Sequence, residues 1–145
     1  MLVRQATIAD IHTVSELLAI LFEDSVESSL EENQRLFADP RQAFFLACDG
    51  DDAAGVAHGA LRSEYVNGRE SEGDCGYLEG IYILPKYRSK GAAKALVAAV
   101  ADWAKSKGCT ELCSDCLLEN TESYRFHTKI GFEETERSIF FRMDL

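Results

Sequence analysis

The stretch LPKYRSKGAA, residues 84–93, decides which fold this sequence predicts. Before it, the run YLEGIYIL at 77–84 is rich in β-branched and aromatic residues, as strands are, and Pro85 ends it. After it, residues 92–107 repeat apolar side chains at helical spacing until Gly108, a residue that favours a helix C-terminus. The sequence therefore predicts a strand that passes through a turn of small and basic residues into a long helix.

The composition of that turn suits a bound pyrophosphate. Gly91, Ala92 and Ala93 are small enough for a ligand to approach the backbone closely. Backbone N–H groups at a helix start are free, and the helix dipole favours an anion there. Arg88 and Lys90 add positive charge. The alternative is an ordinary strand-to-helix turn whose small residues only pack; neither a Walker A loop nor a three-glycine dinucleotide motif is present.

The rest of the chain extends this pattern in both directions. Strands are expected at residues 2–5, 43–48, 53–65, 77–84, 111–115 and 134–144, and helices at 8–22, 29–37, 92–107 and 120–130. Strands alternate with helices in the second half, which indicates parallel pairing there. We therefore predict an α/β fold with a mixed sheet, in the order β-α-α-β-β-β-α-β-α-β. The length fits one domain over residues 1–145.

The charge of the chain limits its partners. Fifteen basic and 25 acidic side chains give a formal net charge of −10. This argues against a nucleic-acid partner, which needs a basic surface, and favours a cationic one, although net charge also serves solubility. No apolar run is long enough to span a membrane, and the N-terminus lacks a signal-peptide pattern, so we expect no membrane partner and a cytoplasmic location.

The five cysteines are expected to be free thiols. Their number is odd and the chain reads as cytoplasmic, where disulfides are rare. Cys109, Cys113 and Cys116 have a spacing that also invites a zinc site. A structural zinc site usually needs four ligands, and no fourth Cys or His lies near them in the sequence. We therefore expect no metal.

The spacing Arg88-x-x-Gly91-x-Ala93 resembles the acetyl-CoA-binding signature of the GNAT superfamily, and the order of elements is similar to the GNAT fold. The resemblance implies acetyl-CoA as the cosubstrate. It also implies that the strands carrying Glu79 and Asp115 splay apart to admit pantetheine. Asn120 resembles the family's pantetheine-contacting asparagine, although a helix N-cap is its other reading. The cofactor-binding residues so implied are Ile81, Tyr82, Ile83, Arg88, Ser89, Lys90, Gly91, Ala92, Ala93, Lys94 and Asn120.

Three further stretches are similar to aminoglycoside 6′-N-acetyltransferases: EYVNG at 64–68, YLEGIYILP at 77–85 and FEETER at 132–137. The resemblance implies transfer of an acetyl group to the 6′-amino group of an aminoglycoside. Carboxylates pair well with the ammonium groups of such a molecule, although each acid is alternatively a solvated surface residue. Ser25 stands where the family has a histidine after an aromatic residue. The substrate-binding residues so implied are Phe22, Tyr65, Glu79, Asp115 and Glu136.

The expected reaction is direct attack of the amine on the thioester in a ternary complex. Glu79 is the candidate base, Asp115 orients the amine, and a backbone N–H after Glu79 stabilises the oxyanion. Many GNAT enzymes have a tyrosine acid in the pattern Tyr-x-x-x-Gly-Phe, and this chain has His127 at that place. Tyr124 and water are the other candidate acids.

The sequence leaves alternatives for the acceptor and for the oligomeric state. The acceptor is alternatively a polyamine or a peptide amine, or the chain is a non-catalytic acetyl-CoA-binding module. Residues 139–141 are an apolar run in the last expected strand. The family commonly pairs through this strand, so we expect a homodimer; the alternative is that the run belongs to the core.

Overall fold

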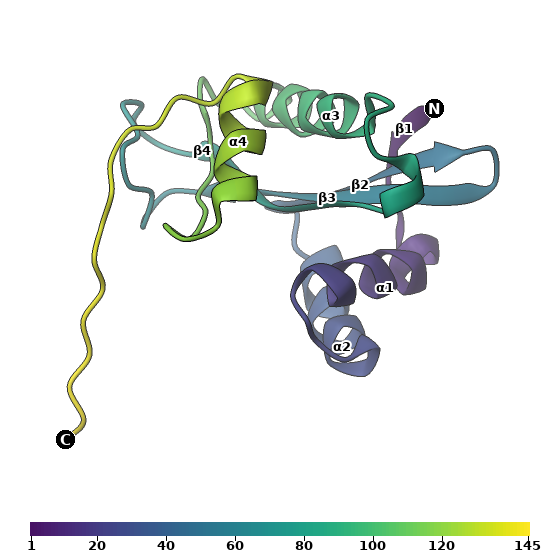
Figure 1. The fold of residues 1–145 in the computed structure, drawn as a ribbon, viewed down its shortest axis with the longest axis horizontal. Helices are drawn as coiled ribbons and strands as arrows, with labels where there is room; N and C mark the ends of the chain where they lie inside the picture. The colour runs from purple at the N-terminus through teal and green to yellow at the C-terminus, as the bar shows by residue number, and fades with distance from the viewer.

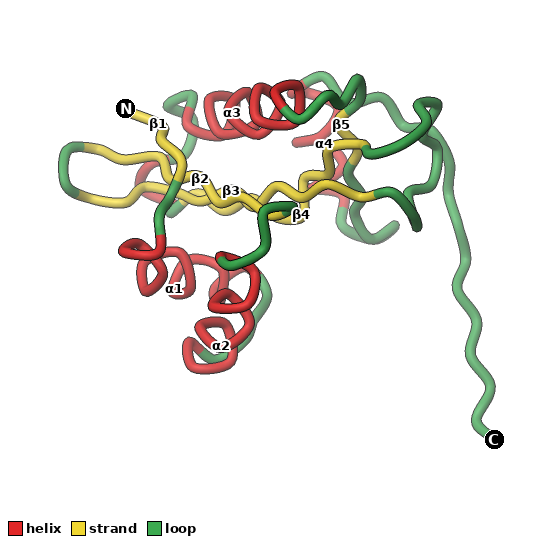
Figure 2. Tube along the Cα trace, turned by 180° about the vertical axis from the view of Figure 1, so that it is seen from behind, coloured by secondary structure: helices red, strands yellow, loops and turns green.

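The computed structural model describes residues 1–145 and places helices on both faces of one sheet (Figure 1). The strands are β1 (Leu2–Gln5), β2 (Gln42–Asp49), β3 (Asp52–Arg62), β4 (Cys75–Ile83) and β5 (Leu112–Cys113). The helices are α1 (Ile11–Leu21), α2 (Val26–Phe37), α3 (Ala92–Ser106) and α4 (Thr121–Ile130), with single 3₁₀ turns at Ile8–Asp10 and Pro85–Tyr87. Helices α1 and α2 cover one face, and α3 and α4 lie on the other (Figures 1 and 2).

The strands follow one another in the sheet in the order β1-β2-β3-β4-β5. The first four are antiparallel neighbours, and β5 runs parallel to β4 after the α3 crossover. This confirms the mixed α/β sheet and the parallel pairing predicted for the second half of the chain.

None of the helices has the length and hydrophobicity that a transmembrane helix needs.

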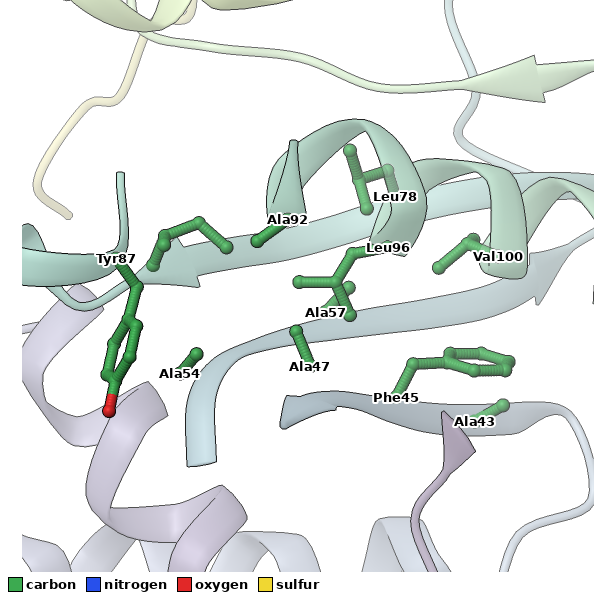
Figure 3. Packing of buried hydrophobic residues seen from close by; sticks show 11 residues of the cluster. Ala43, Phe45, Ala47, Ala54, Ala57, Leu78, Tyr87, Ala92, Leu96 and Val100 are labelled. Carbon is green, nitrogen blue, oxygen red and sulfur yellow. The ribbon is translucent and has the colours of Figure 1, made fainter. Parts of the chain in front are cut away.

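Alternation along the central strands builds a core on each face of the sheet. Phe44, Leu46 and Val56 pack toward α1, whereas their neighbours Phe45 and Ala57 pack toward α3. Alanines on the α3 face of the sheet allow that helix to lie close to it, and Figure 3 shows Leu96 of α3 pointing toward Ala57 and Ala47. A Cβ added at Gly59 would lie 2.8 Å from Val100 Cγ1. This packing fixes α3, and with it the turn that precedes α3, at the end of β4.

Several predicted boundaries move. Helix α2 begins at Val26, three residues earlier than expected, because the Ser25 hydroxyl caps it by accepting from the Ser28 N–H (3.1 Å). Strand β3 ends at Arg62 rather than at residue 65, and β5 has two residues instead of five. At the other helix ends, Gly108 (φ +89°) and Gly131 (φ +116°) adopt the left-handed conformation expected after a helix.

The predicted last strand, residues 134–144, is wrong for the isolated chain. No strand forms after α4, and the segment extends away from the sheet (Figure 1). Its apolar side chains are exposed, with Phe140 at 88% and Phe141 at 91%, so the alternative that they belong to the core is also wrong. The residues have the composition of a strand, but the short β5 edge gives them no ladder of backbone hydrogen bonds to join.

Candidate active site

The turn before α3 presents a row of free backbone donors. Ser89 and Gly91 have left-handed φ angles of 62° and 85°. None of the six consecutive N–H groups from Ser89 to Lys94 donates a hydrogen bond within the protein, and the first bonded amide is that of Ala95, to the Gly91 carbonyl (3.1 Å). Such a concave run of amides at a helix N-terminus binds anions. The turn therefore has the free backbone N–H groups that the sequence predicted for it.

Basic residues lie next to these amides in the chain. Arg88 donates its Nε to the Ile83 carbonyl (2.9 Å), which ties the turn to the end of β4. Lys86 and Lys90 lie against the buried ring of Tyr87, with Nζ at 4.9 and 5.8 Å from its centroid. Lys94 is exposed in the first turn of α3. These residues fit the charge of coenzyme A in an otherwise acidic chain.

The edge of β4 opens where β5 leaves it. The two strands pair only at Gly76 with Leu112 and at Tyr77 with Cys113. One residue on, the Ser114 hydroxyl lies 3.1 Å from the Leu78 carbonyl oxygen, and β4 then pairs with β3 alone up to Ile83. The predicted splay is therefore present, and Ile81, Tyr82 and Ile83 lie along the edge of β4 that β5 leaves unpaired. An extended pantetheine arm fits beside such an edge as an added strand does.

A β-bulge in β4 sets the direction of Glu79. His58 pairs with Gly80 and the next residue, Gly59, pairs with Leu78, so Glu79 is the extra residue. Glu79 and Gly80 therefore both face α1: Glu79 lines a cavity beneath it, and a Cβ at Gly80 would lie 3.0 Å from the Phe22 ring. Without the bulge, strict alternation would turn Glu79 and Gly80 to opposite faces of the sheet.

Glu79 is paired with an arginine, Arg62, that the sequence did not predict for the site. Arg62 donates Nε and Nη2 to the two carboxylate oxygens of Glu79, at 2.8 and 2.7 Å. The same guanidinium lies 3.6 Å above the ring of Tyr77, whose hydroxyl donates to Asp115. Arg62 and Tyr77 thus connect the two predicted acids. Only the register of three strands reveals this link, because the four residues share no sequence motif.

The titration of this group follows from its contacts. The hydrogen bonds to Glu79 raise the pKa of Arg62, so the arginine stays charged. Burial and the contact with Asp115 raise the pKa of the Tyr77 hydroxyl, so Tyr77 remains a donor at neutral pH. The Asp115 carboxylate therefore keeps this donor throughout the physiological range.

A cavity of about 250 Å³ lies between Glu79 and the first two helices. Three carboxylates line it, from Asp24, Glu32 and Glu79, and no lysine or arginine does. His58 also lines it, with Nε2 2.6 Å from the side-chain oxygen of Gln42. Burial lowers the pKa of His58 to about 4, so its ring is neutral at pH 7. The cavity is acidic and suits an ammonium group. Its other lining residues are Leu18, Phe22, Ser29, Asn33 and Leu36.

The remaining predicted acceptor residues are less closely gathered. Phe22 lines the cavity although its side chain is 57% exposed. Tyr65 is 90% exposed with a left-handed φ of 58°, and its carbonyl oxygen lies 3.5 Å from Arg62 Nη1. Glu136 lies on the exposed C-terminal segment, next to Thr135, whose side chain lies directly against Gly68. No hydrogen bond joins Glu136 to the other predicted acids.

On α4, Asn120 is the helix N-cap, with Oδ1 accepting from the Ser123 N–H (3.1 Å), as its alternative reading predicted. Its Nδ2 makes no hydrogen bond in the protein. His127 Nε2 lies 2.8 Å from Ser114 Oγ, whereas Tyr124 donates its hydroxyl to Glu134 at 3.2 Å. Of the two candidate acids, only His127 is connected to the splay.

The cysteines form no disulfide. Burial and the neighbouring Cys75 raise the pKa of Cys113 to about 11, so this thiol is protonated at neutral pH. No group of three or more His, Cys, Asp or Glu side chains is arranged to hold a metal ion.

Comparison with known proteins agrees with this geometry. The model of the acetyltransferase (GNAT) family matches residues 11–132. The chain belongs to the GNAT family. A GNAT relative in Stenotrophomonas maltophilia, an aminoglycoside N(6′)-acetyltransferase type 1, is 43% identical over 144 residues, covering 99% of this chain and 93% of the relative.

Two solved GNAT structures are similar over nearly their whole length. The aminoglycoside 6′-N-acetyltransferase AAC(6′)-IG of Acinetobacter haemolyticus, in its apo form, superimposes with a TM-score of 0.93 at 36% identity, covering 100% of this chain and 99% of that one. AAC(6′)-Iy in complex with the bisubstrate analogue CoA-S-monomethyl-acetylneamine gives a TM-score of 0.91 at 37% identity, with 99% and 97% covered.

Proposed function

We propose that this GNAT enzyme transfers the acetyl group of acetyl-CoA to the 6′-amine of an aminoglycoside, by direct attack in a ternary complex. The main support for the proposal is that one strand, β4, positions both the free amides and the acidic cavity. The free amides from Ser89 to Lys94 follow the end of β4, and the bulge in the same strand turns Glu79 into an acidic cavity. The named activity of relatives such as the S. maltophilia protein supports the substrate class.

The cosubstrate supplies a thioester activated for attack by an amine. The amides of residues 89–94, with Arg88 and Lys90, hold its diphosphate. The open edge of β4 at Ile81–Ile83 and the side-chain amide of Asn120 hold the pantetheine arm. A backbone N–H of β4 beyond Glu79 stabilises the oxyanion that forms during attack.

Glu79 takes the proton of the attacking amine, directly or through a water molecule. Its side chain is 22% exposed, so the carboxylate remains accessible beside Arg62. A carboxylate has about four lone-pair sites, and the bidentate Arg62 contact uses two of them. The remaining sites are available to the amine, while Asp115 orients it and His127 provides the proton that the departing thiolate needs.

The acceptor is bound by charge and by an aromatic face. Asp24 and Glu32 extend the acidic lining beyond Glu79, and the exposed rings of Phe22 and Tyr65 offer apolar faces to the sugar rings. Glu136, on the C-terminal segment, is a further carboxylate for the ammonium groups of the acceptor. Ser25 caps α2, so a helix cap stands where related enzymes have a histidine side chain.

The protein acts as a homodimer. The segment 134–144 has the composition of a strand but no place in its own sheet, and its apolar side chains are exposed. A second copy brings an identical exposed segment, so the two segments can pair with each other and bury their apolar side chains across a two-fold axis. Five free thiols are consistent with action in the cytoplasm. Residues 1–145 act as one domain.

The test is steady-state acetyl transfer to kanamycin, spermidine and a lysine peptide, followed by CoA release. We expect turnover on kanamycin, and a loss of about 10²–10³ in kcat for Glu79→Gln. Glu16→Gln, an exposed change on α1, is the matched control and should retain wild-type rates. Turnover on spermidine alone contradicts the aminoglycoside assignment. Binding of acetyl-CoA without any turnover favours a non-catalytic module.

A further inference from the structure

Ser114 is a hydrogen-bond junction at the inner end of the splay. It is the first residue after β5, and its hydroxyl oxygen lies 3.1 Å from the Leu78 carbonyl and 2.8 Å from His127 Nε2. Leu78 directly precedes Glu79 on the edge of β4 that β5 has just left. Ser114 therefore stands between the imidazole on α4 and the place where the acetyl group must lie for Glu79 to serve the attacking amine.

The acceptors around His127 determine where its protons are. His127 Nδ1 lies 2.7 Å from the Ser123 carbonyl oxygen, which only accepts, so Nδ1 carries a proton. In the neutral ring Nε2 is then bare and accepts from the Ser114 hydroxyl. The Leu78 carbonyl also only accepts, so two acceptors compete for the single proton of Ser114.

A second proton on His127 satisfies every contact in this group. Nε2 then donates to Ser114 Oγ, and Ser114 donates to the Leu78 carbonyl. The rings of Phe126 and Phe132 pack around the imidazole, with centroids 5.3 and 5.2 Å away, and hold it in this position. The arrangement is a chain of two donors, from His127 through Ser114, that ends in the splay.

We propose that Ser114 relays the proton of His127 to the sulfur of the departing coenzyme A; this rests on the proposed acetyl transfer. As the C–S bond breaks, its electron pair passes to sulfur, and Ser114 Oγ–H protonates that sulfur. His127 Nε2–H reprotonates Ser114 Oγ in the same movement. The products are the thiol of CoA and a neutral His127, which regains its proton from solvent, while Glu79 holds the proton taken from the amine.

Ser114 also links the end of β5 to β4 through its bond to the Leu78 carbonyl, and the experiment must separate this structural role from the relay. We measure single-turnover acetyl transfer to kanamycin for Ser114→Ala, Ser114→Thr, His127→Gln and the double variant Ser114→Ala/His127→Gln. A relay predicts a loss of about tenfold to a hundredfold in rate for Ser114→Ala, with KM for both substrates within twofold of wild type. Ser114→Thr, which keeps a hydroxyl, restores most of the rate.

The double variant decides the question. Two residues in one relay lose it together, so the double variant should be no slower than the slower single variant. A readout independent of turnover is the ¹⁵N NMR signature of His127 in the unliganded protein, which should show protonated Nδ1. Losses that multiply in the double variant, or Ser114→Ala at wild-type rate, overturn the relay and leave the proposed function intact. A wild type without turnover on any amine overturns both.

Discussion

Replacing Arg62 with Gln should weaken both the fold and the reaction. The variant loses the bidentate contact with Glu79 and the contact with the Tyr77 ring. The side chains of Arg62 and Glu79 are 31% and 22% exposed, so the pair is partly buried. The free energy lost when it is broken lies between the value for an exposed pair, below about 1 kcal/mol, and the value for a buried pair, about 3–5 kcal/mol. Adding about 0.5–1 kcal/mol for the cation–π contact gives a loss of about 2 kcal/mol in the free energy of unfolding. For a chain of this size, that lowers Tm by about 6 °C.

The effect on activity follows from the freedom that Glu79 gains. Without Arg62 the carboxylate has no fixed orientation toward the amine, and a loss of about 1.4 kcal/mol in transition-state stabilisation lowers kcat about tenfold. The assays are thermal melting and steady-state CoA release on the best aminoglycoside substrate. Because Arg62 no longer competes for the carboxylate, KM for the aminoglycoside should not rise.

The matched control is Arg41→Gln. Arg41 also makes a bidentate pair, with Asp74 at 2.9 and 2.8 Å, but the pair does not contact Glu79. This variant should lose stability and keep kcat. If Arg62→Gln melts earlier yet keeps kcat within twofold of wild type, Arg62 supports the fold alone and does not position Glu79.

The other predictions concern the turn, the buried histidine and the C-terminal segment. Gly91→Val places a β-branched residue at φ +85°, which strains the turn, and should raise the Kd for CoA at least tenfold by calorimetry without changing aminoglycoside binding. For His58, the pKa of about 4 in the folded state lies below the ordinary 6.5, so the unfolded chain binds the extra proton and stability falls as pH drops from 6.5 to 4. On the order of 3 kcal/mol is lost over this window, and urea unfolding of His58→Gln should lack that part of the loss. Phe140→Asp with Phe141→Asp should give a monomer in sedimentation; an unchanged dimer would contradict pairing through this segment.

The sequence predicts best what is decided locally. The β4 strand, the turn at 84–93 and helix α3 each carry their own signal in neighbouring residues, and the free amides follow from that geometry. The segment 134–144 also carries a strand signal, but a strand needs a partner, and the pattern of one chain does not reveal whether its own sheet provides one.

The candidate site was predicted in part for the same reason. Glu79 is conspicuous as an acid in an apolar strand. Its direction depends on a bulge that shows only in the pairing of β3 with β4. Arg62 and Ser114 reach the site through strand register, at separations of 17 and 36 residues from Glu79 and Leu78, so their contacts do not follow from neighbouring residues.

The central claim is that the turn before α3 binds the diphosphate of coenzyme A at the end of the strand that carries Glu79. Backbone amide NMR during titration with CoA, and separately with pantetheine, tests it most directly, because pantetheine lacks the diphosphate. The account predicts that CoA shifts the amide resonances of residues 89–94 strongly and that pantetheine leaves them nearly unchanged. If saturating CoA leaves the resonances of those six amides unchanged while it shifts the resonances of other residues, the claim is contradicted.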